Sequence, residues 1–316
     1  MHQHDAPILL FATPRYRPLA AAMLELGVLD EGTLDVRTFP DGEWYQRLVT
    51  PVAGRRVALL GGTIDDAAAM RLYDLACAAA EGGALALSLV VPYYGYSTME
   101  RATKPGEVVT AKSRARLLSS VPLAHHGNEV LLLDLHTAGL PHYFEGPITP
   151  VHLSARAVVL RAAQRLTADN RFVLGSVDTG RAKQVESLAL ELGAGVAFVF
   201  KRRVDGDTTR VAAVSAAVDG QTVLIYDDMI RTGGSLLGAA RAYRDAGARR
   251  IAAIATHGVL PGDALARLRA SKLFDEVVVT DSHPRARELE AEHRGFLTVE
   301  SIAPLLHGAL VRRERR

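Results

Sequence analysis

Short apolar runs, each followed by a helical stretch, recur along the whole chain and constrain its fold more than any other feature. The runs are continuous in Val, Ile, Leu and Ala instead of alternating with polar residues, which is typical of parallel strands buried on both faces. We predict strands at Ile8–Ala12, Arg56–Leu60, Ala84–Val91 and Glu129–Leu133, and then at Phe172–Ser176, Val196–Phe200, Thr222–Asp227, Ile251–Thr256 and Glu276–Thr280.

The intervening stretches have helical patterns, at Asp65–Glu81, Ala155–Leu166, Ala182–Leu192 and Gly234–Ala246. Strands that alternate with helices predict an α/β fold with mainly parallel sheets. A chain of 316 residues is long enough for two domains. Gly and Pro interrupt the alternation of strands and helices at Gly146–Pro150. We therefore predict two lobes, residues 1–148 and 149–316, each with a mainly parallel sheet flanked by helices. Ligands should bind at the carboxyl ends of the strands and in a cleft between the lobes.

Composition excludes several classes of protein. The formal net charge of +2 gives no indication of a nucleic-acid partner or an anionic membrane. No apolar stretch has the length of a membrane span, and Met1 to Pro7 lack the pattern of a signal peptide. Cys77, the single cysteine, cannot form an internal disulfide, and we interpret it as a small buried hydrophobe. A reducing cytoplasm fits this composition best.

The most informative segment runs from Val223 to Ser235. An apolar strand ends in Asp227 and Asp228, and a Gly-rich turn then opens a helix. The backbone N–H groups of such a turn, with the positive end of the helix, can bind a phosphate. The two carboxylates could accept hydrogen bonds from neighbouring ribose hydroxyls. The alternative is an ordinary strand-to-helix turn capped by Ser235.

This segment resembles the signature of type I phosphoribosyltransferase folds, in which an acidic pair precedes a Thr/Gly-rich phosphate loop. The resemblance implies that the loop holds a 5-phosphate and that the acidic pair holds the ribose. The implied ribose-phosphate site comprises Asp227, Asp228, Arg231, Thr232, Gly233, Gly234 and Ser235.

Further segments occur in one order along the chain. They are Phe39-Pro-Asp41-Gly42-Glu43, Val91-Pro-Tyr-Tyr-Gly95-Tyr, Lys104–Lys112, Asp134-Leu-His136, Ser176-Val-Asp178-Thr-Gly180, Lys201-Arg202-Arg203 and Ala255-Thr-His-Gly-Val-Leu260. Their order and spacing resemble the ribose-phosphate pyrophosphokinases from near Leu9 to Leu306. That resemblance implies two phosphoribosyltransferase-like lobes and a homo-oligomer, a dimer or a hexamer. It also implies Mg²⁺-dependent transfer of pyrophosphate from ATP to the C1 hydroxyl of ribose 5-phosphate, which gives phosphoribosyl pyrophosphate and AMP.

The same resemblance assigns roles to single residues. Lys201 would be the cation that compensates transition-state charge, and Arg203 would assist it from the same loop. The alternative for this basic cluster is a solvated surface. His136 and Asp178 each follow a strand and would support the Mg²⁺ that enters with ATP. The alternative for His136 is a core histidine bonded to a backbone carbonyl.

The ATP side involves two segments. Phe39, Asp41, Gly42 and Glu43 form a hairpin-like turn that, by the resemblance, reaches the adenine of ATP bound to a neighbouring subunit. The alternative is an ordinary Asp-Gly turn. After Tyr96, the nucleotide-binding positions are Thr98, Met99 and Arg101.

The chain departs from the family pattern at two places. Thr98 and Met99 replace an Arg-Gln pair that ordinarily touches ATP, whereas Arg101 keeps its charge. Arg231 stands where the family usually has Asp, which places a cation beside the sugar. Three alternatives follow: the same chemistry on a larger 5-substituted ribose such as ADP-ribose, a catalytically silent regulatory homologue, and a phosphoribosyltransferase that attaches a base. The retained Lys201 and His136 argue against silence, and the two-lobed match argues against base attachment.

Overall fold

The computed structural model describes residues 7–167, 172–177, 179–205 and 208–313. The chain divides into two compact units, Met1–Ser154 with Ile302–Arg316, and Ala155–Ser301. Within the described ranges, every helix is too short or too polar to span a bilayer.

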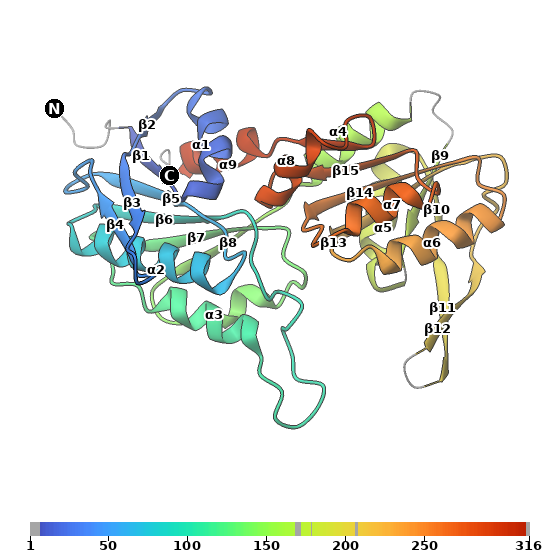
Figure 1. Cartoon of the computed structure of the whole chain (residues 1–316), viewed down its shortest axis with the longest axis horizontal. Helices are drawn as coiled ribbons and strands as arrows, with labels where there is room; N and C mark the ends of the chain where they lie inside the picture. The colour runs from blue at the N-terminus through green and yellow to red at the C-terminus, as the bar shows by residue number, and fades with distance from the viewer. Residues whose placement is uncertain (1–6, 168–171, 178, 206–207, 314–316) are drawn as a thin grey trace. The chain divides into compact units, whose positions relative to one another are not determined.

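The first unit is built on a six-stranded parallel sheet with the strand order β2-β1-β5-β6-β7-β8. Helices α2 and α3 lie on one side of this sheet, and α1 and α9 lie on the other (Figure 1). The elements are β1 Ile8–Ala12, η1 Pro14–Tyr16, α1 Arg17–Leu24, β2 Leu29–Glu31, β3 Leu34–Thr38, β4 Trp44–Leu48, β5 Arg56–Leu60, α2 Asp66–Glu81, β6 Ala86–Val91, α3 Thr110–Ser119, β7 Asn128–Leu133, η2 Leu140–Tyr143, β8 Thr149–Leu153 and α9 Ala303–Arg313.

The second unit is built on another six-stranded parallel sheet, with the order β10-β9-β13-β14-β15-β16. Its elements are α4 Arg156–Leu166, β9 Phe172–Ser176, η3 Thr179–Arg181, α5 Ala182–Leu192, β10 Gly195–Ala197, β11 Val199–Asp205, β12 Thr208–Val214, β13 Thr222–Ile230, α6 Gly234–Asp245, β14 Arg250–Gly258, α7 Ala264–Ala270, β15 Glu276–Thr280, α8 Pro284–Glu290 and β16 Leu297–Glu300.

The strands of the second sheet are apolar on both faces because helices cover both. On β13, Val223 and Ile225 pack in a core with α6, whereas Leu224 and Tyr226 pack in a core with α4 and α5. Successive residues of a strand point to opposite faces, so two covered faces require a continuous apolar run. The predicted α/β fold, with two mainly parallel sheets flanked by helices, is thereby confirmed.

The two units share one topology. In each, the second strand in the chain lies at the edge of the sheet beside the first, and the next parallel strand pairs on the other side of the first. An antiparallel hairpin is inserted at the same stage, β3–β4 in the first unit and β11–β12 in the second. The strand order therefore reverses between β1 and β5, and between β9 and β13. Such reversals open a crevice at the carboxyl ends of the strands, where ligands of α/β proteins bind.

Several details differ from the sequence predictions. The compact units divide after Ser154 and not after residue 148, because β8 pairs with β7 and α9 packs on α1. The predicted strand Val196–Phe200 is two strands in two sheets, β10 and β11. Lys201, predicted on a loop, lies on a strand of the β11–β12 hairpin.

Candidate active site

The acidic pair lies inside β13, and not at its end as predicted, because pairing with β14 continues to Ile230. The side chains of Asp227 and Asp228 are hydrogen-bonded to each other, and the N–H of Asp228 also donates to Asp227 Oδ1 over 2.9 Å. Asp228 also forms an ion pair with Arg181, which directly precedes α5. The two carboxyl groups therefore lie side by side, so that one ligand could contact both.

The charge of the pair is compensated unequally. Asp228 is 4% exposed, and its Oδ2 lies 2.5 Å from a guanidinium nitrogen of Arg181. Burial raises the pKa of Asp227 above its ordinary value, and the neighbouring carboxylate of Asp228 raises it further. The positive charge of Arg181 opposes this shift only in part. Both effects favour the protonated form of Asp227.

The raised pKa of Asp227 predicts that Asp227→Asn stabilises the fold increasingly as the pH rises. In the unfolded chain this carboxyl ionises near its ordinary pKa of about 3.9, whereas in the folded chain it ionises at higher pH. The stability that it contributes is therefore complete below the ordinary pKa and is lost as the pH rises through the raised one. We expect equal Tm values for the two proteins near about pH 4 and a higher Tm for the variant near about pH 9. A difference in Tm that does not change with pH would contradict this.

The loop that follows β13 has the geometry of an anion site. Gly233 is buried with a φ of +78°, a left-handed conformation that favours glycine, and α6 begins at Gly234. Arg231, Thr232 and Ser235 are exposed around it. The first N–H groups of a helix have no partner within the helix, and they carry partial positive charge. Loop and helix together can therefore bind a phosphate.

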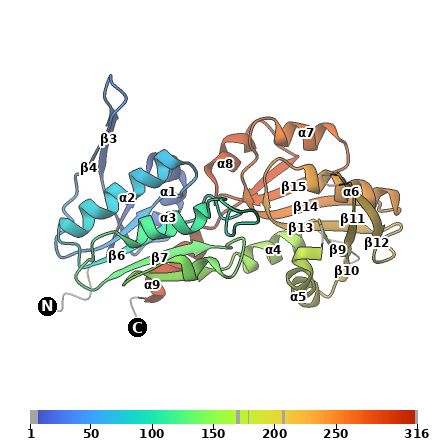
Figure 2. The ribbon, with the colours of Figure 1, turned by 90° about the horizontal axis from the view of Figure 1, so that it is seen from below.

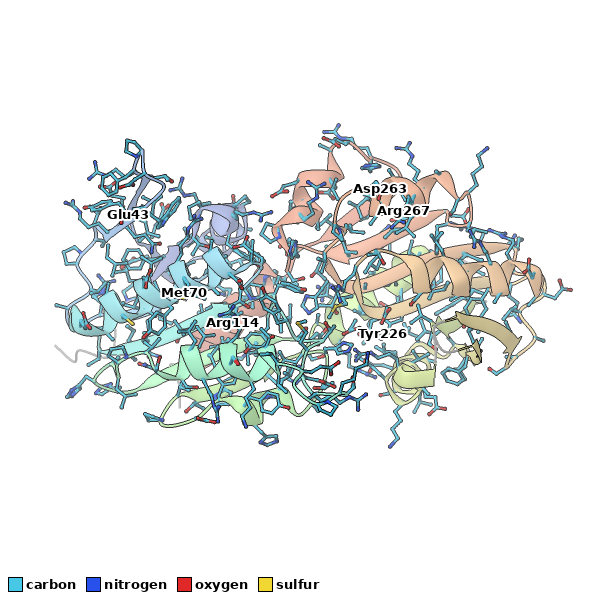
Figure 3. The ribbon with its side chains drawn as sticks, turned by 60° about the horizontal axis from the view of Figure 1, so that its bottom comes forward. Glu43, Met70, Arg114, Tyr226, Asp263 and Arg267 are labelled. Atoms are coloured by element: carbon cyan, nitrogen blue, oxygen red, sulfur yellow. The ribbon has the colours of Figure 1, made fainter. Side chains whose placement is uncertain are left out.

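Helix α7 holds this loop in place. The guanidinium of Arg267 donates a hydrogen bond of 2.7 Å to the carbonyl of Thr232, and it lies 3.3 Å from Asp263 (Figure 3). In a trans peptide the following N–H points away from the carbonyl, so the N–H of Gly233 faces away from Arg267. The residue that orients the loop was not found by the sequence analysis, because it lies on a different helix.

In the first unit, the corresponding position is the loop after β5, and side chains occupy the space beside it. After β5, the residues Gly61 and Gly62 lead toward α2, but the side chains of Thr13 and Tyr16 occupy the space beside these two glycines. Asp65 caps α2 by accepting a hydrogen bond of 2.7 Å from the N–H of Ala68. A carboxylate at this helix end opposes the binding of a second anion. Of the two equivalent positions, the one after β13 is therefore suited to a phosphate.

The predicted turn on the ATP side is the tip of the β3–β4 hairpin, which projects from the sheet (Figure 2). Gly42 has a φ of +94°, and the N–H of Glu43 donates to Asp41 Oδ1 over 3.0 Å. Phe39 is 42% exposed and makes an edge contact with Tyr45, with 6.0 Å between ring centroids. The tip thus presents an aromatic ring and carboxylates together. That this tip contacts ATP bound to a neighbouring subunit stays a prediction.

The second segment on the ATP side follows Tyr96, which has a φ of +62°. Met99 is 47% exposed, and its N–H donates to the carbonyl of Tyr96 over 2.8 Å. Thr98 precedes it, and Arg101 is exposed with its guanidinium 3.6 Å from Glu100. These three residues are together in one exposed turn, and their contact with a nucleotide stays a prediction.

A guanidinium that the sequence analysis missed lies beside this turn. Arg114 of α3 forms an ion pair of 2.7 Å with Asp66, which also accepts a hydrogen bond from the hydroxyl of Tyr96 (Figure 3). The guanidinium carbon lies 5.4 Å from the centre of the Tyr96 ring. Arg114 therefore fixes the start of the turn that carries Thr98 and Met99. The only sequence signal was an arginine in an otherwise amphipathic helix.

The predicted metal and catalytic residues are described only in part. His136 follows β7 closely, after a turn in which Asp134 has a φ of +34° and Leu135 donates to the imidazole of His152. Asp178 lies outside the described residues. Among the residues that are described, no group of three His, Cys, Asp or Glu side chains could hold a metal ion.

Lys201 and Arg203 lie on β11, whose backbone pairs with β12. Their side chains are outside what the structure describes. Cys77, predicted to be buried, is half-buried on α2, and burial raises the pKa of its thiol, which disfavours the reactive thiolate.

Comparison with known proteins agrees with this architecture. The N-terminal domain of ribose phosphate pyrophosphokinase matches residues 8–121, and a phosphoribosyl synthetase-associated domain matches residues 177–313. The ribose-phosphate pyrophosphokinase of Prochlorococcus marinus is 35% identical over 91% of this chain and 84% of its own length. That of Chlorobaculum tepidum is 32% identical over 84% of this chain and 78% of its own length. The phosphoribosylpyrophosphate synthetase structure from Mycobacterium smegmatis has a TM-score of 0.85 at 28% identity, over 98% of this chain and 99% of its own.

Fold and site thus define a transferase with two phosphoribosyltransferase-like units. The chain belongs to the ribose-phosphate pyrophosphokinase family. It is a ribose-phosphate diphosphokinase, a kinase of nucleotide biosynthesis that transfers diphosphate groups.

Proposed function

We propose that this enzyme transfers the β,γ-pyrophosphoryl group of Mg·ATP to the C1 hydroxyl of ribose 5-phosphate, which yields phosphoribosyl pyrophosphate and AMP. The observation that carries the proposal is the loop after β13, where a left-handed glycine and a helix start adjoin two carboxylates. A phosphate at the loop leaves the ribose hydroxyls within reach of Asp227 and Asp228. Membership of the family supports the same chemistry.

Each group has a distinct task in this proposal. The loop from Arg231 to Ser235 binds the 5-phosphate, and the acidic pair orients the sugar. Phosphoryl transfer depends mainly on positioning and on cations that offset charge on the transferred group. Lys201 and Arg203 would supply these cations.

The nucleotide side would use the hairpin tip and the turn at Thr98, Met99 and Arg101. Mg²⁺ prefers oxygen ligands and keeps several waters, so a metal bound to nucleotide oxygens needs few protein ligands. We propose that His136 and Asp178 support it. The bound Mg²⁺ would neutralise charge on the triphosphate.

The test is an end-point assay with ATP labelled on its γ-phosphate. We expect the label in the sugar product and AMP in equal amount, because the β- and γ-phosphates move as one unit. ADP as the main nucleotide product would contradict pyrophosphoryl transfer and would indicate transfer of a single phosphoryl group.

The acceptor has one alternative that a specific residue favours. Arg231 is exposed at the start of the phosphate loop, and its planar guanidinium suits phosphate oxygens. An added cation helps an acceptor that carries more negative charge, such as ADP-ribose. We nevertheless propose ribose 5-phosphate as the acceptor, because one changed residue in a short motif is a weak signal.

We expect wild type to favour ribose 5-phosphate over ADP-ribose by about tenfold or more in kcat/KM, and Arg231→Asp to keep that order. Kinetics with both sugars in both proteins measure this. An advantage for ADP-ribose that disappears in Arg231→Asp would show instead that Arg231 binds the additional phosphate.

We also propose that the protein is a homo-oligomer, a dimer or a hexamer, in which Phe39, Asp41 and Glu43 serve the ATP site of a neighbour. The exposed aromatic ring at the hairpin tip supports this. The cytoplasm stays the expected compartment.

A further inference from the structure

Two side chains of β13, those of Tyr226 and Asp228, contact residues at the start of α5. Arg181, the last residue of η3, forms an ion pair of 2.5 Å with Asp228. Three residues later, Gln184 donates a hydrogen bond of 2.9 Å to the hydroxyl of Tyr226, which is labelled in Figure 3. The other terminal nitrogen of Arg181 lies 3.4 Å from Gln184 Oε1. The four side chains form one continuous network.

The topology explains why Arg181 reaches this carboxylate. Strands β9 and β13 are neighbours, and Ser176 at the end of β9 pairs with Tyr226. The chain that leaves β9 therefore starts beside the acidic pair, and a single turn of η3 brings Arg181 over Asp228. This is the point where the strand order reverses, at the carboxyl edge of the sheet.

Burial makes the ion pair a geometric constraint. The side chain of Asp228 is 5% exposed and that of Arg181 is 17% exposed. The carboxylate of Asp228 is thus almost shielded from water, and the rigid guanidinium fixes the direction of the carboxylate that it contacts. Gln184, which is itself held by its hydrogen bond to Tyr226, contacts the guanidinium in turn. Asp228 is thus held more firmly than a carboxylate on a flexible turn would be.

We propose that Arg181 is a positioning residue of the sugar site, which holds Asp228 in one orientation toward the adjacent hydroxyls of a pentose phosphate. The inference rests on the proposed function, because it assigns the acidic pair to the sugar. Arg181 acts through Asp228 and does not touch the transferred group. Its removal should therefore weaken sugar binding and leave the nucleotide side unchanged.

The test compares Arg181→Gln, Arg181→Lys and a matched control. We expect Arg181→Gln to raise the KM for ribose 5-phosphate by about thirtyfold, with the KM for ATP and kcat within about threefold of wild type. Arg181→Lys keeps the charge and should recover part of the loss. The control is Arg156→Gln, which removes an ion pair of 2.7 Å between α4 and Glu191 of α5. It should leave all three constants unchanged.

A double variant guards against simple misfolding. Arg181→Gln leaves a buried carboxylate without its main counter-charge, and this can unfold the protein. Arg181→Gln with Asp228→Asn removes both charges together. If Arg181 acts through Asp228, the double variant should bind the sugar no more weakly than Asp228→Asn alone. If the losses of sugar binding caused by Arg181→Gln and by Asp228→Asn instead add up in the double variant, the proposal is overturned.

Other outcomes separate the inference from the proposed function. A lower Tm of Arg181→Gln with an unchanged KM for the sugar would show that Arg181 has only a structural role. The proposed pyrophosphoryl transfer would not be affected by that result. If wild type forms no AMP, calorimetric titration with ribose 5-phosphate alone still decides the inference. Binding that Arg181→Gln weakens would support it without the proposed function, and no binding by wild type would overturn it.

Discussion

Lys201→Ala is expected to lower kcat by on the order of a hundredfold, with a smaller effect on KM. The reason is that a fixed cation stabilises the transferring group more in the transition state than in the bound substrates. Lys201 lies on β11, part of an antiparallel hairpin inserted into the second unit (Figure 1). The backbone of this segment pairs with β12, with a register shift between Phe200 and Lys201, whereas the sequence suggested a loop. Steady-state kinetics with ATP and ribose 5-phosphate measure the effect.

The matched control for this variant is Arg202→Ala, which removes the same unit charge from the next position of β11. We expect it to keep most of the activity. Near-normal turnover by folded Lys201→Ala would show that this basic cluster is only a solvated surface. Equal losses in both variants would indicate a general field effect of the hairpin, without a specific role for Lys201.

Gly233→Ala is expected to raise the KM for ribose 5-phosphate on the order of a hundredfold, since small displacements of a binding loop have effects of this size. Gly233 has a φ of +78°, which costs a residue with a side chain roughly 1 kcal/mol or more. An added Cβ would also lie 3.0 Å from Leu268 Cδ2 on α7. Relief of both strains would move the N–H groups that we propose to bind the phosphate. The KM for ATP should change little.

Gly238→Ala supplies the control within the same helix. A Cβ at Gly238 meets nothing within 4 Å, and alanine in a helix interior is favoured over glycine by roughly 0.5–1 kcal/mol. We expect a slightly higher Tm and unchanged kinetics. If Gly233→Ala also binds the sugar normally, the loop after β13 is not the phosphate site.

The sequence by itself determined the α/β class and the positions of most parallel strands. Continuous apolar runs such as those of β5 and β13 predict strands, because strands covered on both faces need apolar residues at successive positions. The candidate phosphate loop could be predicted from the sequence for a local reason as well. The left-handed glycine, the first residue of the helix and the residues with hydroxyl groups follow one another along the chain. One short segment therefore contains all the groups of the candidate site.

Tertiary structure decided what depends on distant segments. Short strands such as β8 and β10 were missed or misassigned, because pairing with a neighbour and not local propensity makes them strands. Arg181, Arg267 and Arg114 are ordinary arginines in the sequence, and only the packing of η3, α7 and α3 brings each to its partner. The two units share one topology, yet Tyr16 fills the crevice of the first beside Gly62. Which crevice can take a phosphate depends on these contacts, because they join residues that are far apart along the chain.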